Sequence, residues 1–578
     1  MKQEELFEQR LKEHYDELKW LYCELYGSMD MFYRLCRTMK DFFVRRKDSL
    51  KQLDEERLEN PGWYKGNSLL GMMMYTDAFA GSLKGVQKKL DYIQECNVNC
   101  LHLMPLLQMP ETDNDGGYAV SDYTRVDSRL GTMADLSRLT DACRKKGICV
   151  CLDFVMNHTS MEHEWARRAR AGEKEYQDRY FFFDDFDIPA RYEKTCPQVF
   201  PTTAPGNFTW LEDIGKYVMT TFYPYQWDLN YRNPAVFNDM TGYLLNLANH
   251  GIDILRIDAV PYIWKELGTS CRNLPQVHTI VRMLRMICEI VCPGVLLLGE
   301  VVMAPDKVVP YFGTLEKPEC HMLYNVTTMA TLWHTAAVKD AALLKRQTEI
   351  VAALPKDYVF LNYIRCHDDI GWGLEYGWLK EHHMEENPHK KFLNDYFTGK
   401  YPGSLSRGEL YNDDPSSGDA RLCGTAASLC GIEAACESKN PEDLQKALSL
   451  DLLLHGYMMS LSGIPMIYSG DEVARLNDYT YHEDPKKADD SRYIHRGPFL
   501  WEEATLRHTP GTIQQRIFEG LEKMETLRKE LEVFSQESSL SLKETWDSSV
   551  LCLCRQGGSQ YLVSLFNFSD QPKDRKSV

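Results

Sequence analysis

One short apolar segment carries an arginine and an aspartate at a spacing that suits catalysis. Residues 251–259 read Gly-Ile-Asp-Ile-Leu-Arg-Ile-Asp-Ala, and the alternation of a β-strand places Arg256 and Asp258 on the same face. An arginine beside a carboxylate lowers the pKa of that acid, so we expect Asp258 to be ionised at neutral pH, as a nucleophile must be. A structural ion pair between the two residues is the alternative interpretation.

A second carboxylate follows the next apolar strand. Glu300 comes directly after residues 295–299, which are Val-Leu-Leu-Leu-Gly. An aliphatic environment raises the pKa of a carboxyl group and keeps it protonated, as a general acid must be. One ionised and one protonated carboxyl group are the pair that glycoside cleavage uses. For Glu300 considered alone, a solvated acid at a strand end is the alternative.

Two further strand ends carry imidazole and carboxylate groups. Asp153 to His158 follows one apolar strand, and Arg365 to Asp369, which includes His367 and Asp368, follows another. A lone histidine at such a place is usually an ordinary core or loop residue. Because four strand ends all provide groups that can hydrogen-bond a sugar, we favour one common site over four unrelated positions.

The elements that must position these groups follow a strand and helix rhythm. Apolar segments at residues 69–75, 100–106, 148–155, 252–257, 295–299, 358–364 and 465–468 predict strands, and helical periodicity separates several of them. Repeated βα units predict a parallel sheet. We therefore expect an α/β fold, a (β/α)8 TIM barrel, whose active site lies at the carboxyl ends of the strands.

Four regions are predicted outside the bare barrel. Residues 1–62 have helical periodicity, and the catalytic barrel is expected at 63–535. The stretches 159–231 and 369–429 are too long for ordinary connections, so we expect two functional insertions, the second resembling a lid. Short alternating strands at 536–578 predict a small C-terminal β-domain.

Composition excludes several classes of protein. The chain has 578 residues and a net charge of −18, which disfavours nucleic acid and anionic membranes as partners. The absence of a secretion-signal pattern and of an apolar stretch of about 20 residues predicts a cytoplasmic protein without a membrane span. The 18 cysteines are expected as reduced thiols because they are spread through a large chain that lacks an export signal, and none has zinc-ligand spacing with histidines nearby.

The ordered motifs resemble the α-amylase superfamily, glycoside hydrolase family 13, and within it the amylosucrases. The broad match rests on Asp153 to His158, the strand ending at Asp258, Glu300, and His367 with Asp368. The finer match covers most of residues 60–500 and rests on Asp115–Tyr123, Gln226–Tyr231, Gly268–Cys271, Cys366–Trp372, Ser417–Arg421, Gly470–Glu472 and Asp489–Arg492.

The resemblance implies a role for each matching residue. Asp258 would be the nucleophile, Glu300 the acid/base, and Asp368 the carboxylate that binds two sugar hydroxyls. Asp115 and Arg492 would form a salt bridge that closes the far end of the glucosyl pocket, so that only a terminal glucosyl unit fits. Substrate contacts are further implied for Tyr118, His158, Arg256, His367, Asp369 and Arg421. For Tyr118, an ordinary core aromatic is the alternative.

The implied reaction is the cleavage of sucrose through a covalent β-glucosyl-enzyme, with release of fructose and transfer of glucose to an α-1,4-glucan acceptor. Pro197 and Gln198 stand where amylosucrases tend to have an arginine, so sucrose hydrolysis or another α-glucosidase activity stays open. A non-catalytic barrel scaffold is a distant alternative.

No cofactor is expected. Asn157 matches a calcium-binding position of many α-amylases, but amylosucrase-like proteins generally do without the ion, so no required metal is expected. The oligomeric state is left open.

Overall fold

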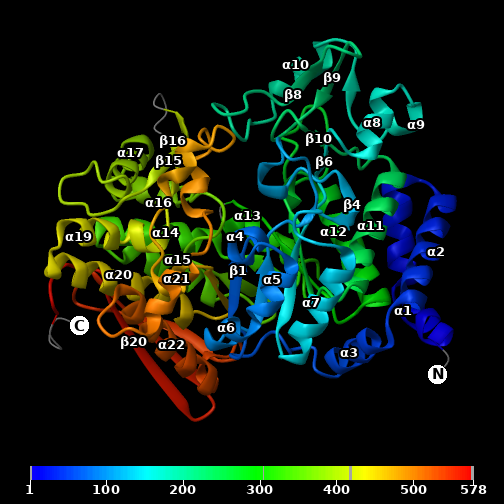
Figure 1. Cartoon of the computed structure of the whole chain (residues 1–578). Coiled ribbons are helices and arrows are strands. Elements are labelled where there is room, and N and C mark those ends of the chain that lie inside the picture. The colour runs from blue at the N-terminus through cyan, green and yellow to red at the C-terminus, as the bar shows by residue number, and fades with distance from the viewer. Residues whose placement is uncertain (1–2, 304, 415–418, 574–578) are drawn as a thin grey trace.

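Eight parallel strands close into a barrel (Figure 1). The computed structural model describes residues 3–303, 305–414 and 419–573. Around the barrel the strands follow one another in chain order, which confirms the (β/α)8 prediction. They are β1 (Gly71–Met74), β2 (Cys100–Leu103), β5 (Cys149–Val155), β11 (Ile254–Asp258), β12 (Leu296–Gly299), β13 (Met322–Tyr324), β14 (Val359–Asn362) and β17 (Ile464–Tyr468).

The register of the central strands sets the positions of the charged residues. Every residue of β5 and β11 is buried, and Arg256 on β11 is opposite Asp153 on β5 and Leu298 on β12. Since side chains alternate between the two sides of a strand, Arg256 and Asp258 point to the same side of the barrel wall. The strand β13 was not anticipated because its three residues are too few for a recognisable pattern.

Local sequence signals begin several of the helices that surround the barrel. At α7, the Thr132 hydroxyl accepts the backbone N–H of Asp135, and the Asp135 carboxylate accepts the N–H of Thr132. Asparagine followed by proline begins both α11 and α20. The surrounding helices include α5 (Leu83–Lys88), α6 (Leu90–Glu95), α7 (Met133–Lys145), α11 (Pro234–Asn249), α12 (Pro275–Val291), α14 (Val326–Val338), α15 (Ala342–Ala352), α20 (Pro441–Ser460) and α22 (Ile513–Glu530).

The N-terminal region consists of three helices that pack on one flank of the barrel. These are α1 (Gln3–Tyr26), α2 (Met29–Arg45) and α3 (Asp48–Glu59), and Figure 1 shows α1 and α2 beside α11 and α12. The Tyr22 hydroxyl donates a 2.9 Å hydrogen bond to Asn238 Oδ1 on α11. Arg46, which follows α2, is paired with Asp54 and donates to the carbonyl of Ala248. These helices are therefore joined to the barrel by buried polar contacts.

Two groups of short elements stand above the barrel in Figure 1. The first contains α8 (Glu164–Arg170), α9 (Lys174–Gln177), α10 (Asp187–Glu193) and the sheet β7 (Phe182–Phe183), β9 (Lys216–Met219), β8 (Phe208–Leu211), and it is bracketed by the paired strands β6 (His158–Ser160) and β10 (Gln226–Asp228). The second contains α16 (Tyr376–Glu381), α17 (Glu386–Phe397), β15 (Glu409–Asp414) and β16 (Asp419–Cys423).

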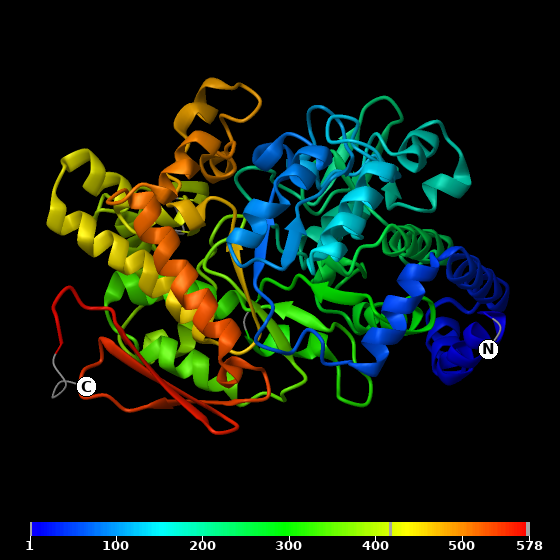
Figure 2. The ribbon, with the colours of Figure 1, turned by 60° about the horizontal axis from the view of Figure 1, so that its bottom comes forward.

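A three-stranded antiparallel sheet forms the C-terminal region. Its strands are β18 (Ser539–Lys543), β19 (Val550–Gly557) and β20 (Gln560–Asn567). Figures 1 and 2 place this sheet on the flank of the molecule opposite the N-terminal helices. The fully buried Arg555 donates hydrogen bonds to the carbonyls of Val533, Ser460 and Ser535, which joins the sheet to the barrel. Residues 574–578 of the predicted β-domain lie outside the described residues.

In the described parts of the chain, every helix is too short or too polar to span a bilayer.

Candidate active site

One buried guanidinium holds three carboxylates from three adjacent strands. Arg256 Nη1 lies 2.7 Å from Asp153 Oδ1 and 2.5 Å from Asp258 Oδ1. Its other terminal nitrogen, Nη2, lies 2.6 Å from Glu300 Oε1. Asp258 ends β11 and Glu300 directly follows β12, so both emerge at the carboxyl end of the barrel. The structure thus brings the two predicted catalytic carboxyl groups together around Arg256.

The backbone at the end of β11 also holds Glu300. The N–H of Ala259 donates a 2.9 Å hydrogen bond to Glu300 Oε2. Ala259 has φ of +47°, in the left-handed region that residues with a Cβ rarely adopt. This strained residue turns the chain directly after Asp258 and directs its N–H towards Glu300.

Burial dominates the electrostatics of this carboxyl pair. It raises the pKa of Asp258 well above its usual range, and the Glu300 charge acts in the same direction, while Arg256 opposes both effects. Burial also raises the pKa of Glu300. Our expectation that Arg256 would lower the pKa of Asp258 overall is therefore wrong. One guanidinium cannot neutralise three buried carboxylates, so the pair retains a proton to higher pH than isolated acids.

Asp368 is held from two sides at the same end of the barrel. Its Oδ1 accepts a 3.2 Å bond from Arg496 Nη2, and its Oδ2 lies 3.2 Å from His367 Nε2. Arg496 Nε also donates to the His367 carbonyl over 2.7 Å. The sequence analysis did not single out Arg496. Its position four residues after Arg492, in one basic segment, was the available signal.

Tyr118 joins the histidine to the central ion cluster. Its hydroxyl donates to Asp153 Oδ1 over 3.0 Å and lies 2.7 Å from His367 Nε2. Because the hydroxyl has one proton, this network assigns the Nε2–H tautomer to His367. The two rings are stacked, with centroids 5.5 Å apart. His158 Nε2 donates to the Tyr118 carbonyl over 3.1 Å, and burial lowers the pKa of His158 to about 3, so its ring is neutral.

A further arginine–aspartate ion pair joins two distant parts of the chain. Arg492 Nη2 is 2.8 Å from Asp115 Oδ1 and 2.8 Å from Asp490 Oδ2. Gln226 Nε2 donates to the second oxygen of Asp115 over 3.2 Å. Burial raises the pKa of Asp115, whereas Arg492 outweighs burial at Asp490 and lowers its pKa to about 2. The predicted contact between Asp115 and Arg492 is thus present, and Asp490 shares the arginine.

The two long insertions contact each other over the barrel. Arg421 Nη1 is 3.3 Å from Asp369 Oδ2, and its Nη2 donates to the Val199 carbonyl over 3.3 Å. The side chains of Phe200 and Tyr411, one from each insertion, belong to one small buried cluster. Asp369 and Arg421 therefore lie at the junction of the insertions. Ser417 and Gly418 of the motif that contains Arg421 lie outside the described residues.

A lysine ammonium is bound next to the Asn157 side chain. Lys265 Nζ donates to Asn157 Oδ1 over 2.7 Å, pairs with Asp228 Oδ2 at 3.4 Å, and also donates to the Tyr262 carbonyl. The side chains of Lys265 and Asp228 are both fully buried. Three oxygens that could coordinate a metal cation thus contact the ammonium group of Lys265.

We expect Lys265→Met to lower the free energy of unfolding by about 3–5 kcal/mol, because it leaves Asp228 buried without its cation. Urea unfolding at pH 7 measures the change. The double variant Lys265→Met/Asp228→Asn removes the charge as well and should recover much of the loss. A single variant as stable as the unaltered protein would show that the buried pair contributes nothing.

Three possible metal ligands also meet within the described residues. Ligand atoms of Cys366, His367 and Asp368 lie within 4.8 Å of one another. The His367 nitrogen nearest Asp368, Nε2, donates to Tyr118, and Asp368 accepts from Arg496. These hydrogen bonds already engage the histidine and the carboxylate in the network described above.

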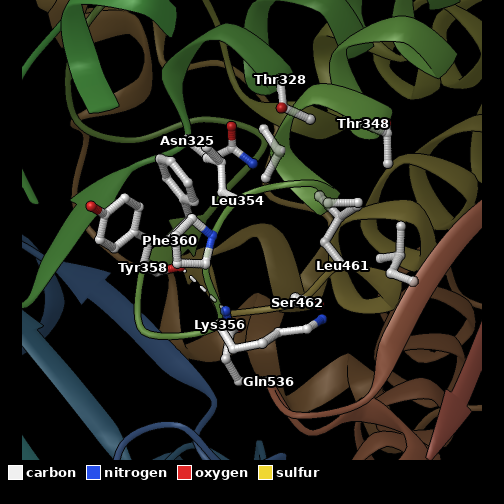
Figure 3. Close-up of a pocket in the computed structure, with 14 residues that line it drawn as sticks. Asn325, Thr328, Thr348, Leu354, Lys356, Tyr358, Phe360, Leu461, Ser462 and Gln536 are labelled. Atoms are coloured by element: carbon white, nitrogen blue, oxygen red, sulfur yellow. Dashed lines mark hydrogen bonds between the residues drawn. The ribbon is translucent and has the colours of Figure 1, made fainter. Parts of the chain in front are cut away.

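A separate cavity of about 30 Å³ lies among α14, α15 and β14 (Figure 3). It is lined by residues that precede β14 and β17, including Tyr358 and Ser462, and by Gln536 below the C-terminal sheet. Thr328 Oγ1 and Gln536 Oε1 have no hydrogen-bond partner in the described structure. The cavity has room for one or two water molecules, which would satisfy these atoms. It is distinct from the carboxylate cluster.

Comparison with protein families gives a direct match. The model described as "Alpha amylase, catalytic domain" matches residues 46–370. This range contains Arg256, Asp258, Glu300 and Asp368.

Individual relatives cover different shares of the chain. A trehalose synthase of Pimelobacter sp. (strain R48) is 31% identical over 325 residues, which are 54% of this chain and 56% of that protein. The chain thus spans little more than half the length of this relative. A glucosylglycerate phosphorylase of Escherichia coli (strain K12) is 26% identical over 541 residues, 91% of this chain and 89% of that protein.

Solved structures show the same fold. The sucrose 6F-phosphate phosphorylase from Thermoanaerobacter thermosaccharolyticum superposes with a TM-score of 0.68 at 19% sequence identity, covering 87% of this chain and 94% of that one. The trehalulose synthase MutB from Pseudomonas mesoacidophila MX-45 has a TM-score of 0.64, also at 19% identity.

Proposed function

Because this chain belongs to the alpha-amylase family, we propose that it transfers the glucosyl unit of sucrose through a covalent β-glucosyl-enzyme, as amylosucrases do. Fructose leaves first, and the 4-hydroxyl of a glucan then takes the glucose. Membership of the family supports the chemistry of glucosyl transfer or hydrolysis. The choice of donor and acceptor is the finer part of the proposal.

The observation that carries the choice of donor is the Asp115–Arg492 ion pair. Following the resemblance to amylosucrases, we place this pair, whose 2.8 Å contact is braced by Asp490 and Gln226, at the closed end of the glucosyl pocket. A pocket closed at that end accepts one terminal sugar unit, whereas cleavage within a long chain requires an open groove. A disaccharide whose glucosyl unit is terminal fits this arrangement.

The proposed reaction uses the shared proton of the carboxyl pair. With the proton on Glu300, ionised Asp258 attacks the anomeric carbon, and Glu300 protonates the departing fructose oxygen. Glu300 then removes the proton of the incoming hydroxyl, which attacks the anomeric carbon and releases Asp258. Arg256 contacts both carboxyl groups, so it keeps them in position while the proton leaves and returns.

We expect Glu300→Gln to lower kcat/KM for sucrose by about 10²–10⁴-fold, the usual contribution of a general acid. Since burial raises the pKa of Glu300, the unaltered enzyme should stay active above pH 4.5 and lose activity as the pH rises through that raised pKa. The pH profile of kcat/KM is the measurement. Glucosylation by α-glucosyl fluoride, whose leaving group needs no proton, should be far less impaired in the variant. An equal loss with both donors would contradict the assignment of Glu300.

A phosphorylase is the second candidate. The observation that favours it is the glucosylglycerate phosphorylase of E. coli, which is similar over 91% of this chain. Phosphate in place of the sugar acceptor would yield glucose 1-phosphate from the same intermediate. Arg421 and Arg272, whose side chains both donate to the backbone of residues 197–199, provide positive charge near the junction of the insertions.

One experiment separates these activities. Purified protein is incubated with sucrose, with and without phosphate, and free fructose, free glucose, glucose 1-phosphate and glucan are followed over time. Fructose in excess of glucose together with glucan supports the amylosucrase proposal, and equal fructose and glucose indicate a sucrose hydrolase. Glucose 1-phosphate formed only with phosphate indicates a phosphorylase. No release of fructose by folded protein rejects sucrose as the donor.

A further inference from the structure

Two cysteines from distant parts of the chain meet beside the active site. Cys196 follows α10 in the first insertion, and Cys271 lies in the barrel loop after β11. Their Sγ atoms are 3.2 Å apart and both thiols are free. A disulfide bond is about 2.05 Å long, so an approach of about 1 Å would join them.

The surroundings hold the two thiols against each other. Tyr192 and Met219 of the insertion form a small buried cluster with both cysteines, and Leu267 of the barrel loop packs against it. The loop is fixed as well, because the Thr269 hydroxyl accepts the backbone N–H of Cys271 over 3.1 Å. Cys196 and Cys271 retain exposed fractions of 6% and 4%, so neither residue is completely closed off from solvent.

The contact between the sulfurs is polar. Cys196 Sγ donates a hydrogen bond to Cys271 Sγ, and this bond lowers the pKa of Cys271 to about 6 while it raises the pKa of Cys196. The lowered pKa favours the thiolate form of Cys271, and the thiolate is the reactive form of cysteine. The arrangement is that of an attacking thiolate next to a resolving thiol.

We propose that Cys196 and Cys271 are a reversible redox pair, which hydrogen peroxide converts into a disulfide between the first insertion and the catalytic barrel. The Cys271 thiolate attacks one peroxide oxygen, the O–O bond breaks, and sulfenic acid and hydroxide form. Cys196 then attacks the Cys271 sulfur and water leaves. Two thiols are oxidised and one peroxide is reduced to two waters; a dithiol reductant reverses the change.

The disulfide would brace the edge of the active site. Adjacent to the pair, Arg272 Nη2 donates to the Pro197 carbonyl over 2.8 Å. Two residues further along, the Val199 carbonyl accepts from Arg421, which is paired with Asp369. A covalent bond between residues 196 and 271 would therefore fix the segment 196–199, whose Val199 carbonyl accepts from Arg421.

Peptide mapping tests the proposal without reference to activity. Native reduced protein is exposed to equimolar hydrogen peroxide, quenched with catalase, denatured, alkylated with iodoacetamide and digested. We expect one cross-linked peptide that contains Cys196 and Cys271 and that dithiothreitol separates. The buried pair Cys288 and Cys292, at the end of α12, serves as an internal control and should remain alkylated. Alkylated Cys196 and Cys271, or over-oxidised Cys271 beside free Cys196, would overturn the proposal.

Variants provide the second measurement. Peroxide should raise the melting temperature of the unaltered protein, because the bond closes a loop between residues 75 positions apart. Cys196→Ser should abolish both the cross-link and this shift, and dimedone should then trap the sulfenic acid on Cys271. Cys436→Ser, a half-buried cysteine on α19 (Ile432–Ser438), is the matched control and should behave as the unaltered protein. A shift that persists in Cys196→Ser would contradict the assignment.

Discussion

Asp258→Asn should abolish glucosyl transfer and at the same time raise the melting temperature at pH 7. Loss of the nucleophile is expected to lower kcat by at least about 10⁴-fold. We expect a gain in the free energy of unfolding on the order of 1–2 kcal/mol, because Asp153, Asp258 and Glu300 crowd around one guanidinium. The amide oxygen of the variant side chain can still accept a hydrogen bond from Arg256, but it carries no buried negative charge. Sucrose turnover and thermal unfolding measure the two effects.

The pH dependence of that gain has a defined sign. Burial raises the folded-state pKa of Asp258, so the folded protein binds this proton more tightly than the unfolded chain does. The cost of the ionised group is absent below the ordinary pKa of aspartate, about 3.9, and grows as the pH rises above it. The difference in melting temperature between variant and unaltered protein should therefore be small near pH 4 and larger at pH 7.

A second aspartate on the same segment provides the matched control. Asp253 comes just before β11 and its carboxylate pairs with Arg57 at 2.7 Å and accepts the backbone N–H of Val150. Asp253→Asn should therefore lower the melting temperature and leave kcat of the folded enzyme unchanged. If Asp258→Asn lost stability as Asp253→Asn does, the electrostatic account of the carboxyl cluster would be wrong.

Arg492→Ala should lower kcat/KM for sucrose by about 10²–10³-fold. Removal of one partner from a buried charge pair costs about 2–5 kcal/mol, here because Asp115 and Asp490 both lose their shared cation at the proposed closed end of the pocket. The expected loss requires the glucosyl unit to lie against that end. Steady-state kinetics with sucrose gives the ratio, and circular dichroism checks that the variant is folded.

A double-mutant cycle makes this test specific. If the ion pair acts as one unit, the kinetic effects of Arg492→Ala and Asp115→Ala should be strongly non-additive, and the double variant should resemble the worse single variant. Additive losses, or a folded Arg492→Ala enzyme with unchanged kcat/KM, would show that this end of the pocket does not contact the substrate.

The barrel could be predicted from the sequence because its signal is local. Seven of its strands are runs of apolar residues that lie between helical or turn-forming segments. The eighth, Met322–Tyr324, has three residues, and the sheet defines it through hydrogen bonds to both neighbours. The helical segment between β1 and β2 is divided at Lys89, which ends α5 and begins α6. Such a break depends on packing that a periodic pattern does not contain.

Most residues of the candidate site could be predicted from the sequence, but the direction of the pKa shift at Asp258 could not. The carboxylates occur at strand ends, and strand order brings them together. Arg496 was missed because its partner, Asp368, is 128 positions away in the chain. The pKa direction at Asp258 was wrong because the sequence shows the adjacent arginine but neither the burial of the carboxyl group nor the nearby charge of Glu300. Both arise only when the barrel is closed.

The guanidinium of Arg256 links catalysis to the assembly of the fold. Its three partners come from β5, β11 and the end of β12, so they meet only when these strands pair in the observed register. A slip of one residue would turn Arg256 and Asp258 towards the helices and leave their charges in an apolar layer. Misregistered barrels are therefore penalised at the proposed catalytic carboxylates. The ion cluster of the candidate active site thus disfavours barrels in which these strands are misaligned.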